Sequence, residues 1–411
     1  MEAKKSEQTV FNLSAQALDY PLPDERIARY PLPQRDQSKL LVWENGTITD
    51  SCFRSVAGFL PTNSLLIFNN TKVIRARLHF QKNTGSPIEI FCLDPVEPAD
   101  YQLAFQQTGQ CSWNCLVGNL KKWKQEVLVK ELVVDGKTIS FKAEKLAREN
   151  GSVKVRFSWD DPAYDFATLI ETAGTLPIPP YLNRETEDSD LERYQTIYSK
   201  INGSVASPTA GLHFTEAVFK SLEEKQIDCD EVTLHVGAGT FKPVKSETIA
   251  GHEMHAEQIL VRRSLIEKIL SHTGKLIAVG TTSIRTLESL YWLGTTLAEQ
   301  PDASAEKLEV EQWQPYRSHG ILNKTEALKA ILHFMQKNGL TTICASTKII
   351  IVPGYRFRMI DGMITNFHQP QSTLLLLISA FTGDDWKRIY AHALANDYRF
   401  LSYGDSNLYL K

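Results

Sequence analysis

The feature that most constrains this fold is a block of short β-type runs enclosed by segments of mixed pattern. From about His79 to Trp159 the chain reads IEIFCL, YQLAF, EVLVKELVV, TISFKA and VKVRFSW, separated by Gly, Asn and Asp-Gly turns. Alternation of apolar and polar residues between such turns is typical of antiparallel strands. Both flanks mix strand and helix patterns instead. The block is therefore predicted to form an all-β, barrel-like domain inserted into a discontinuous α/β domain.

The length of the chain supports this division, because 411 residues exceed what one hydrophobic core usually serves. The predicted α/β domain combines residues 1–78 and 160–411, and the inserted barrel takes residues 79–159. Strands that alternate with helices predict a three-layer α/β/α-like arrangement for the larger part. In such sheets ligands bind at the carboxyl ends of the strands.

Three segments of the larger part carry the clearest element patterns. LLIFNNTKVIRARL (65–78) reads as a buried strand, a polar corner and a second strand. LIAVG (276–280) reads as a short buried strand, and the following Thr-Thr-Ser run is predicted to cap a helix. IIIVPGYRFRMIDGMITNFH (349–368) reads as a hairpin that turns at Asp361-Gly362.

Composition places the chain among ordinary globular proteins, with 42% hydrophobic and 23% charged residues. The net charge of −3 excludes a globally basic nucleic-acid binder, although Lys121 to Arg156 carries ten Lys/Arg against five Asp/Glu. That run is either a solvated strand face or the best candidate for contacting a polyanion. Six scattered cysteines predict reduced thiols. Without an apolar leader or a run long enough to span a bilayer, a cytoplasmic protein with no membrane contact is expected.

The stretch VTLHVGAGTF, Val232 to Phe241, resembles a strand that enters a nucleotide-binding glycine loop. A dinucleotide loop needs a third glycine where Lys242 stands, and Pro243 blocks the helix that should follow. The stretch is therefore predicted to be a strand ending in a tight glycine turn. His235, two residues before that turn, becomes a candidate for the same pocket.

HEMHAE invites a metal-site interpretation that its spacing does not support. His252 and His255 are three residues apart, and Ala256 occupies the position that a helical zinc motif needs for its second histidine. No metal is therefore predicted. His255 with Glu257 remains either an acid–base pair or a solvated surface pair.

Two further segments combine polar groups with helix starts. GSVASPTAGLHFT (203–215) presents His213 and Phe214 before a helix that Thr215 is predicted to cap, although a tight structural connection with a buried histidine remains the alternative. GTTSIR (280–285) places hydroxyls and Arg285 after a buried strand. That arrangement suits a carboxylate or phosphate, and plain helix capping with Arg285 in a surface ion pair is the alternative.

Ten segments, taken together and in order, resemble one family, the S-adenosylmethionine:tRNA ribosyltransferase-isomerases of the queuosine pathway. They are LDYPLPDERIARYPLPQRDQSKLL, LLIFNNTKVIRARL, LPIPPYL, ERYQTIY, GSVASPTAGLHFT, VTLHVGAGTFKPV, HEMHAE, AVGTTSIRTLESL, PGYRFRMIDGMITNFHQPQSTLLLLISAF and YRFLSYGD. They span residues from about 18 to 405, which is nearly the whole chain.

The resemblance implies an α/β domain with an inserted β-barrel, and it implies the reaction. The ribosyl group of S-adenosylmethionine moves to 7-aminomethyl-7-deazaguanine at the wobble position of tRNA, which gives epoxyqueuosine-tRNA, adenine and methionine. The partners are then S-adenosylmethionine and a tRNA with a GUN anticodon that carries the modified base. No cofactor is expected because S-adenosylmethionine is consumed as a co-substrate, and the protein is expected to be a monomer.

Several positions depart from the family pattern. Asn70, Lys72, Arg75 and Ser207 stand where the family usually has Asp, Arg, Pro and Ala, and ASTKIIIVPGY (345–355) replaces the usual approach to PGY. A neutral Asn70 cannot act as a base, so no base is assigned there.

The resemblance directs attention to groups that would move protons. The sulfonium acidifies the ribose C5′ protons, and protonation assists the departure of adenine. The groups whose pKa suits this work are His213, His235, His255 and Glu257.

Substrate contacts are expected from the matching segments. Arg285 with the Thr281/Thr282 turn is expected to meet the methionine carboxylate or a tRNA phosphate. Arg77, Tyr355 and Arg356 are expected to handle tRNA or the modified base, and Tyr355 and Phe357 on one strand face are either a stacking platform or core. The other candidate substrate-binding residues are Asn69, Thr71, Thr209, Gly211, Phe214, Gly237, Gly239, Thr240, Asn366 and His368.

Two rival functions remain open at this point. One is a metal-dependent hydrolase that uses His252 and His255. The other is a non-catalytic tRNA-binding paralogue, which would bind tRNA fully and release no adenine.

Overall fold

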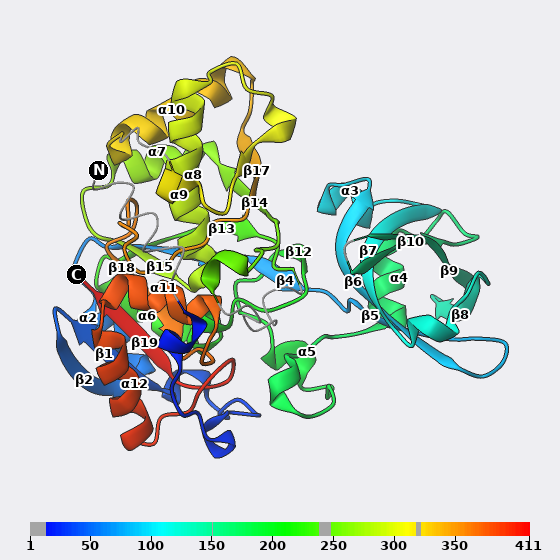
Figure 1. Cartoon of the computed structure of the whole chain (residues 1–411), viewed down its shortest axis with the longest axis horizontal. Coiled ribbons are helices and arrows are strands. Elements are labelled where there is room, and N and C mark those ends of the chain that lie inside the picture. The colour runs from blue at the N-terminus through cyan, green and yellow to red at the C-terminus, as the bar shows by residue number, and fades with distance from the viewer. Residues whose placement is uncertain (1–13, 150, 238–247, 318–321) are drawn as a thin grey trace.

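The structure is a computed structural model that describes residues 14–149, 151–237, 248–317 and 322–411. It is a mixed α/β protein whose elements gather around two large sheets (Figure 1). No helix in the described ranges is long and apolar enough to cross a membrane. All six cysteines are free, as the sequence predicted.

A mixed ten-stranded sheet forms the larger part of the molecule. Its central strands run parallel, and three of them are wholly buried because their short runs are largely apolar on both faces. In sheet order the strands are β16 (Glu309–Val310), β17 (Thr342–Thr347), β14 (Glu257–Arg262), β13 (Asp228–Leu234), β3 (Leu65–Asn69), β15 (Leu276–Val279), β18 (Gly362–Asn366), β19 (Ser406–Leu410), β1 (Lys39–Glu44) and β2 (Thr47–Cys52).

Helices cover both faces of this sheet. Alternate residues of β3 belong to different apolar clusters: Leu65 and Ile67 to one, Leu66 and Phe68 to the other. The first cluster is completed by helices α7 (Arg263–Ser271), α8 (Thr281–Glu299), α10 (Lys324–Lys337), α11 (Thr373–Thr382) and α12 (Asp385–Ala395). The second is completed by α2 (Val56–Phe59) and α6 (Glu216–Glu224).

A second, antiparallel sheet has its own core around Trp113, Phe141 and Phe166. It curls around helix α4 (Phe166–Ala173), but its strand order begins at β11 and ends at β8, so the ladders describe an open, curved sheet (Figure 1). A closed barrel is not confirmed, and the two-domain division stays a prediction. In order the strands are β11 (Gly174–Thr175), β5 (Arg77–Gln81), β6 (Pro87–Glu97), β7 (Gln110–Gly118), β10 (Ser152–Ser158), β9 (Lys137–Glu149) and β8 (Leu128–Val134).

A short parallel ribbon lies between the two sheets. Strand β4 (Thr71–Val73) pairs with β12 (Ile201–Ser204), and the Ile74 amide continues the pairing to the Ser204 carbonyl at 3.0 Å. The first strand predicted in LLIFNNTKVIRARL is confirmed as β3. The single second strand predicted after the polar corner is wrong in its continuity, because it is divided into β4 and the start of β5, which belong to different sheets.

The hairpin predicted for residues 349–368 is wrong in its first half. Only β18 forms, and residues 348–361 follow an irregular path. The physical reason is Glu288 on α8, whose buried carboxylate accepts the amides of Arg358 at 2.9 Å and Met359 at 3.0 Å. Those amides are thereby satisfied without a partner strand.

Helix starts were predicted with mixed success. Thr215 caps α6, because its side chain accepts the Val218 amide. The predicted side-chain cap of α8 is wrong: the N-cap is Gly280, at φ +85°, and Thr281 is already the first helical residue. No side chain caps this helix end.

Candidate functional site

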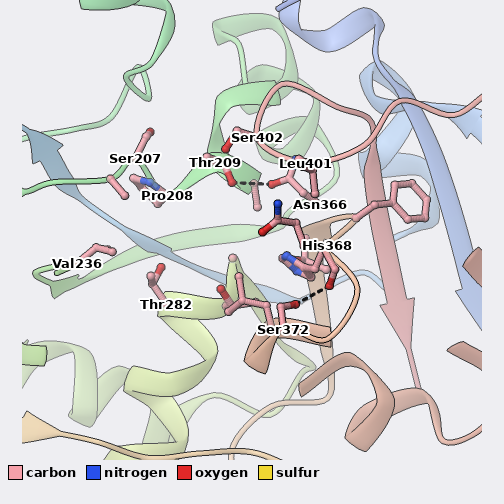
Figure 2. Close-up of a pocket in the computed structure, with 18 of the residues that line it drawn as sticks. Ser207, Pro208, Thr209, Val236, Thr282, Asn366, His368, Ser372, Leu401 and Ser402 are labelled. Atoms are coloured by element: carbon pink, nitrogen blue, oxygen red, sulfur yellow. Dashed lines mark hydrogen bonds between the residues drawn. The ribbon is translucent and has the colours of Figure 1, made fainter. Parts of the chain in front are cut away.

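The candidate site is a cavity at the carboxyl ends of two neighbouring parallel strands. Strand β15 ends at Val279 and β18 ends at Asn366, and the segments that follow them form two of its walls. Its free volume is about 860 Å³ when the open mouth is included. Figure 2 shows that the lining side chains come from several separate segments, at the ends of strands and helices. The lining residues are Tyr181, Tyr194, Ala206, Ser207, Pro208, Thr209, Ala210, Val236, Gly280, Thr281, Thr282, Thr365, Asn366, Phe367, His368, Gln369, Ser372, Thr373, Leu374, Leu401 and Ser402.

Five of the predicted substrate-binding residues meet in this cavity, namely Thr209, Thr281, Thr282, Asn366 and His368. They come from positions up to 159 residues apart, and the parallel strand ends bring them together. Burial lowers the pKa of His368 to about 3, so this ring is neutral at pH 7.

A chain of hydrogen bonds leads from the cavity wall into the core. Thr209 donates through Oγ1 to Asn366 Oδ1 at 2.9 Å, and Asn366 Nδ2 lies 3.2 Å from His213 Nε2. His213 Nδ1 then lies 2.8 Å from Ser38 Oγ. The Asn366 amide can only donate to Nε2, so the imidazole proton sits on Nδ1 and points to Ser38. The donor and the acceptor of each of these three hydrogen bonds are therefore defined.

His213 stands behind the cavity rather than on its wall. It is buried, and this burial lowers its pKa to about 4. The buried-histidine alternative is therefore correct for its position. His213 reaches the cavity through Asn366, which makes it a positioning residue for that amide.

His235 belongs to the contact between the two sheets. Its ring stacks on Tyr101 of α3 (Tyr101–Phe105), with centroids 4.1 Å apart and planes 10° from parallel. Strand β13 ends at Leu234, and the His235 amide still donates to Gln258 at 3.0 Å. Burial lowers its pKa to about 4. His235 does not line the cavity described above, and its place in a glycine-turn pocket stays a prediction because that turn continues into residues outside the described ranges.

His255, Glu257 and Arg285 line an adjoining cavity instead. Glu257 and Arg285 form a buried ion pair, and Arg285 Nε also donates to the Ile349 carbonyl at 3.3 Å. The surface ion pair considered for Arg285 is therefore wrong. The first turn of α11, at Thr373, lines both cavities and separates them.

No described group of three or more His, Cys, Asp or Glu side chains could hold a metal ion. His255 is exposed and also faces a groove shared with Asp94 of the curved sheet.

Other predicted binding residues are structural in this fold. Asn69 bridges Leu234 through both its amide nitrogen and its oxygen, at 3.0 Å each. Thr71 is buried in the ribbon. Phe214 packs in the apolar core, and a Cβ on Gly211 would lie 1.8 Å from the Tyr198 hydroxyl, so this glycine is needed for close packing.

The remaining predicted residues lie apart from the cavity. Tyr355 is buried off any strand and donates to Glu288 at 2.7 Å, so the shared strand face with Phe357 is wrong. Arg356 is exposed. Arg77 pairs with Glu89 on the curved sheet. Gly237 lines the groove beside His255, and Gly239 and Thr240 lie outside the described residues.

The sequence reasoning missed several hydroxyl-bearing residues of the cavity. Ser207 was noted only as a departure from the family pattern, and Ser372 and Thr373 were quoted only within a segment that resembles the family. The sequence pattern that could have identified them is the position of small hydroxyl residues directly before or after buried strands and helices at one edge of the sheet. The missed residues are Tyr181, Tyr194, Ser207, Thr365, Ser372, Thr373 and Ser402.

Comparison with known proteins gives one family and one solved structure of interest. The model of a family described as queuosine biosynthesis protein matches residues 15–409. A crystal structure of S-adenosylmethionine tRNA ribosyltransferase from Thermotoga maritima is 26% identical in sequence. The match covers 96% of this chain and 99% of that chain, with a TM-score of 0.46.

Proposed function

Because the chain belongs to the family of queuosine biosynthesis proteins, we propose that it is an S-adenosylmethionine:tRNA ribosyltransferase-isomerase. It transfers and isomerises the ribosyl group of S-adenosylmethionine onto 7-aminomethyl-7-deazaguanine at the wobble position of tRNA. The products are epoxyqueuosine-tRNA, adenine and methionine. S-adenosylmethionine is a consumed co-substrate in this proposal, and no cofactor takes part.

One observation carries the proposal beyond the family match. Every residue that lines the cavity falls within one of the segments that resemble the ribosyltransferase-isomerases. Those segments are far apart in the sequence, and seven of the ten meet at this cavity. Such a common location is expected if these segments resemble the family because they form its substrate site.

The roles within the site follow from where each group lies. Asn366 and Thr209 form the polar wall, and neutral His213 holds Asn366 in one orientation. His255 and Glu257, in the adjoining cavity, remain the proposed acid–base groups. The proposal also includes the domain organisation: the curved sheet would be the inserted β-barrel domain that the family resemblance implies.

The direct test is incubation of the full chain with S-adenosylmethionine and tRNA that carries the aminomethyl precursor. We expect adenine and methionine to be released in step with epoxyqueuosine, measured by chromatography of the small molecules and of digested tRNA. The same tRNA with unmodified guanine is the control, and it should release no adenine. Full tRNA binding without adenine release would instead identify a non-catalytic paralogue.

We expect His213→Ala to lower kcat about 5- to 150-fold while the KM for tRNA changes little. The substitution removes the acceptor of the Asn366 amide and leaves a buried donor unsatisfied, which costs about 1–3 kcal/mol. His213→Gln, which can still accept from Asn366, should recover part of kcat. If both variants matched the wild type in kcat, the positioning role would be wrong.

The tRNA partner has a candidate contact surface on the curved sheet. The side chains of Lys121, Lys122, Lys124, Lys145 and Arg148 line one concave surface there. This surface lies within the basic run that the sequence singled out, and clustered cations attract an RNA backbone.

Reversing two of these charges should weaken tRNA binding in a salt-dependent way. We expect the Lys121→Glu/Lys124→Glu variant to raise the KM for tRNA and to flatten the slope of log affinity against log salt by about 1 per lost phosphate contact. The KM for S-adenosylmethionine should stay the same. Lys329→Glu, at an exposed position of α10, is the control. An equal effect of this substitution would argue against a specific tRNA surface on the curved sheet.

A further inference from the structure

The cavity is polar but uncharged. Among the described residues that line it there is no Asp, Glu, Lys or Arg, and the histidine they include, His368, is neutral because burial lowers its pKa to about 3. Ten of the lining residues carry hydroxyl groups. A charged ligand group would therefore interact with the neutral dipoles of these residues and with none of their side chains as a formal charge.

Two helix N-termini open into this cavity. The first residues of α8, Thr281 and Thr282, and of α11, Thr373 and Leu374, all line it. The helices are 19 and 10 residues long. Each such end carries partial positive charge from its free amide N–H groups, and α8 begins at a glycine with no side chain to satisfy them. Both ends thus favour an anion at one place.

Unpartnered hydroxyls lie in the same walls. Ser207 is only 6% exposed, and its Oγ is buried with no hydrogen-bond partner. Thr282 Oγ1 is also buried and unpartnered. A buried hydroxyl that lacks a partner costs about 1–3 kcal/mol, so a ligand that accepts these hydrogen bonds relieves the cost.

We propose that this cavity holds the α-carboxylate of S-adenosylmethionine between the N-termini of α8 and α11. The assignment rests on the proposed function and refines it, because Arg285, the cation expected to bind this group, lines the adjoining cavity and pairs with Glu257. A carboxylate at the end of one small ligand suits a hollow of this size better than a phosphate within an RNA chain. The Thr209 hydroxyl donates its hydrogen bond to Asn366, so its oxygen can accept a hydrogen bond from the neighbouring α-ammonium group.

The test is the substitution Thr282→Asp in the full chain. An acidic residue at the second position of a helix is favourable for the helix itself, so this variant should fold, which thermal unfolding will verify. Its carboxylate repels a second carboxylate at the same helix end. By calorimetry, the Kd for S-adenosylmethionine should rise at least about tenfold, while decarboxylated S-adenosylmethionine should bind as it does to the wild type.

Thr325→Asp is the matched control, since Thr325 is the exposed second residue of α10 and lines no part of the cavity. It should leave both affinities unchanged. Equal weakening of the two ligands by Thr282→Asp, or no weakening of either, would overturn the carboxylate assignment. Weaker tRNA binding with unchanged S-adenosylmethionine affinity would also overturn it and would place a phosphate there.

These binding measurements do not depend on turnover. A chain that distinguishes the two ligands in this way but releases no adenine refutes the proposed reaction and leaves the carboxylate subsite in place. A chain that releases adenine while Thr282→Asp treats both ligands alike supports the reaction and refutes the subsite.

Discussion

Arg285→Met is expected to lower the free energy of unfolding by about 3–5 kcal/mol, because it leaves the Glu257 carboxylate buried without this guanidinium. The ion pair joins the first turns of α8 to the start of β14, and Glu257 is only 4% exposed. A charge that stays desolvated after its partner is removed is the costly case. Urea unfolding followed by far-UV circular dichroism measures the change.

Two further variants show whether burial is the cause. Arg285→Met combined with Glu257→Gln should recover much of the lost stability, because the buried negative charge is removed together with the guanidinium. Lys220→Met breaks the exposed pair with Glu224 and should cost no more than about 1 kcal/mol. A loss below about 1 kcal/mol for Arg285→Met would contradict the importance assigned to the buried pair.

Glu288→Ala is expected to cost a similar amount, about 3–5 kcal/mol, and to loosen the segment that contains Tyr355. The Glu288 carboxylate accepts the Tyr355 hydroxyl at 2.7 Å and the amides of Arg358, Met359 and Ile360 at 2.9–3.3 Å. Several buried donors would lose their acceptor together. Amide hydrogen exchange over residues 355–360 should accelerate along with the drop in stability, and unchanged exchange would count against this account.

The acidity of Glu288 adds a pH dependence to this prediction. Burial raises the pKa of its carboxyl in the folded protein. A raised folded pKa means that the folded state holds the proton longer, so the contribution of Glu288 to stability is greatest below its unfolded pKa of about 4.3 and decreases as pH rises through the folded value. Glu288→Gln does not titrate, so its stability deficit relative to wild type should be smaller at pH 8 than at pH 4.

The parts of the fold that could be predicted are those fixed by local pattern. The apolar run of β3 is buried on both faces, and its composition alone indicates this. Thr215 could be identified as a cap because its amide partner is three residues away. Strand alternation in the block from His79 to Trp159 likewise indicated an antiparallel sheet, but YQLAF, predicted as one of its strands, is wrong: it forms helix α3, which begins after the side-chain cap of Asp100.

The failures come from partners that are distant in sequence. Residues 349–361 were predicted as one strand of a hairpin, yet Glu288, about 70 residues earlier, accepts the amides of Arg358 and Met359 in place of a partner strand. Arg285 is paired by Glu257 from another element, which neither segment indicates alone. In the cavity, Thr209 and Asn366 were predicted as binding residues, but their hydrogen bond and its continuation to His213 depend on the packing of the sheet.

The ribbon of β4 and β12 has a mechanical consequence for how a large RNA would be handled. The chain enters the curved sheet directly after β4 and leaves it through β11, whose Thr175 pairs with Arg77 at the start of β5. The entering segment is in turn anchored by the ribbon, with Ile201 opposite Thr71 and Ser204 opposite Val73. Rotation of the curved sheet about the ribbon would strain this pairing and separate the Tyr101–His235 stack, so we expect the sheet to move little relative to the rest of the molecule. Under the proposed function, an RNA bound to the curved sheet is held in a nearly fixed orientation, so we expect the RNA itself to bend to bring its target nucleotide to the cavity.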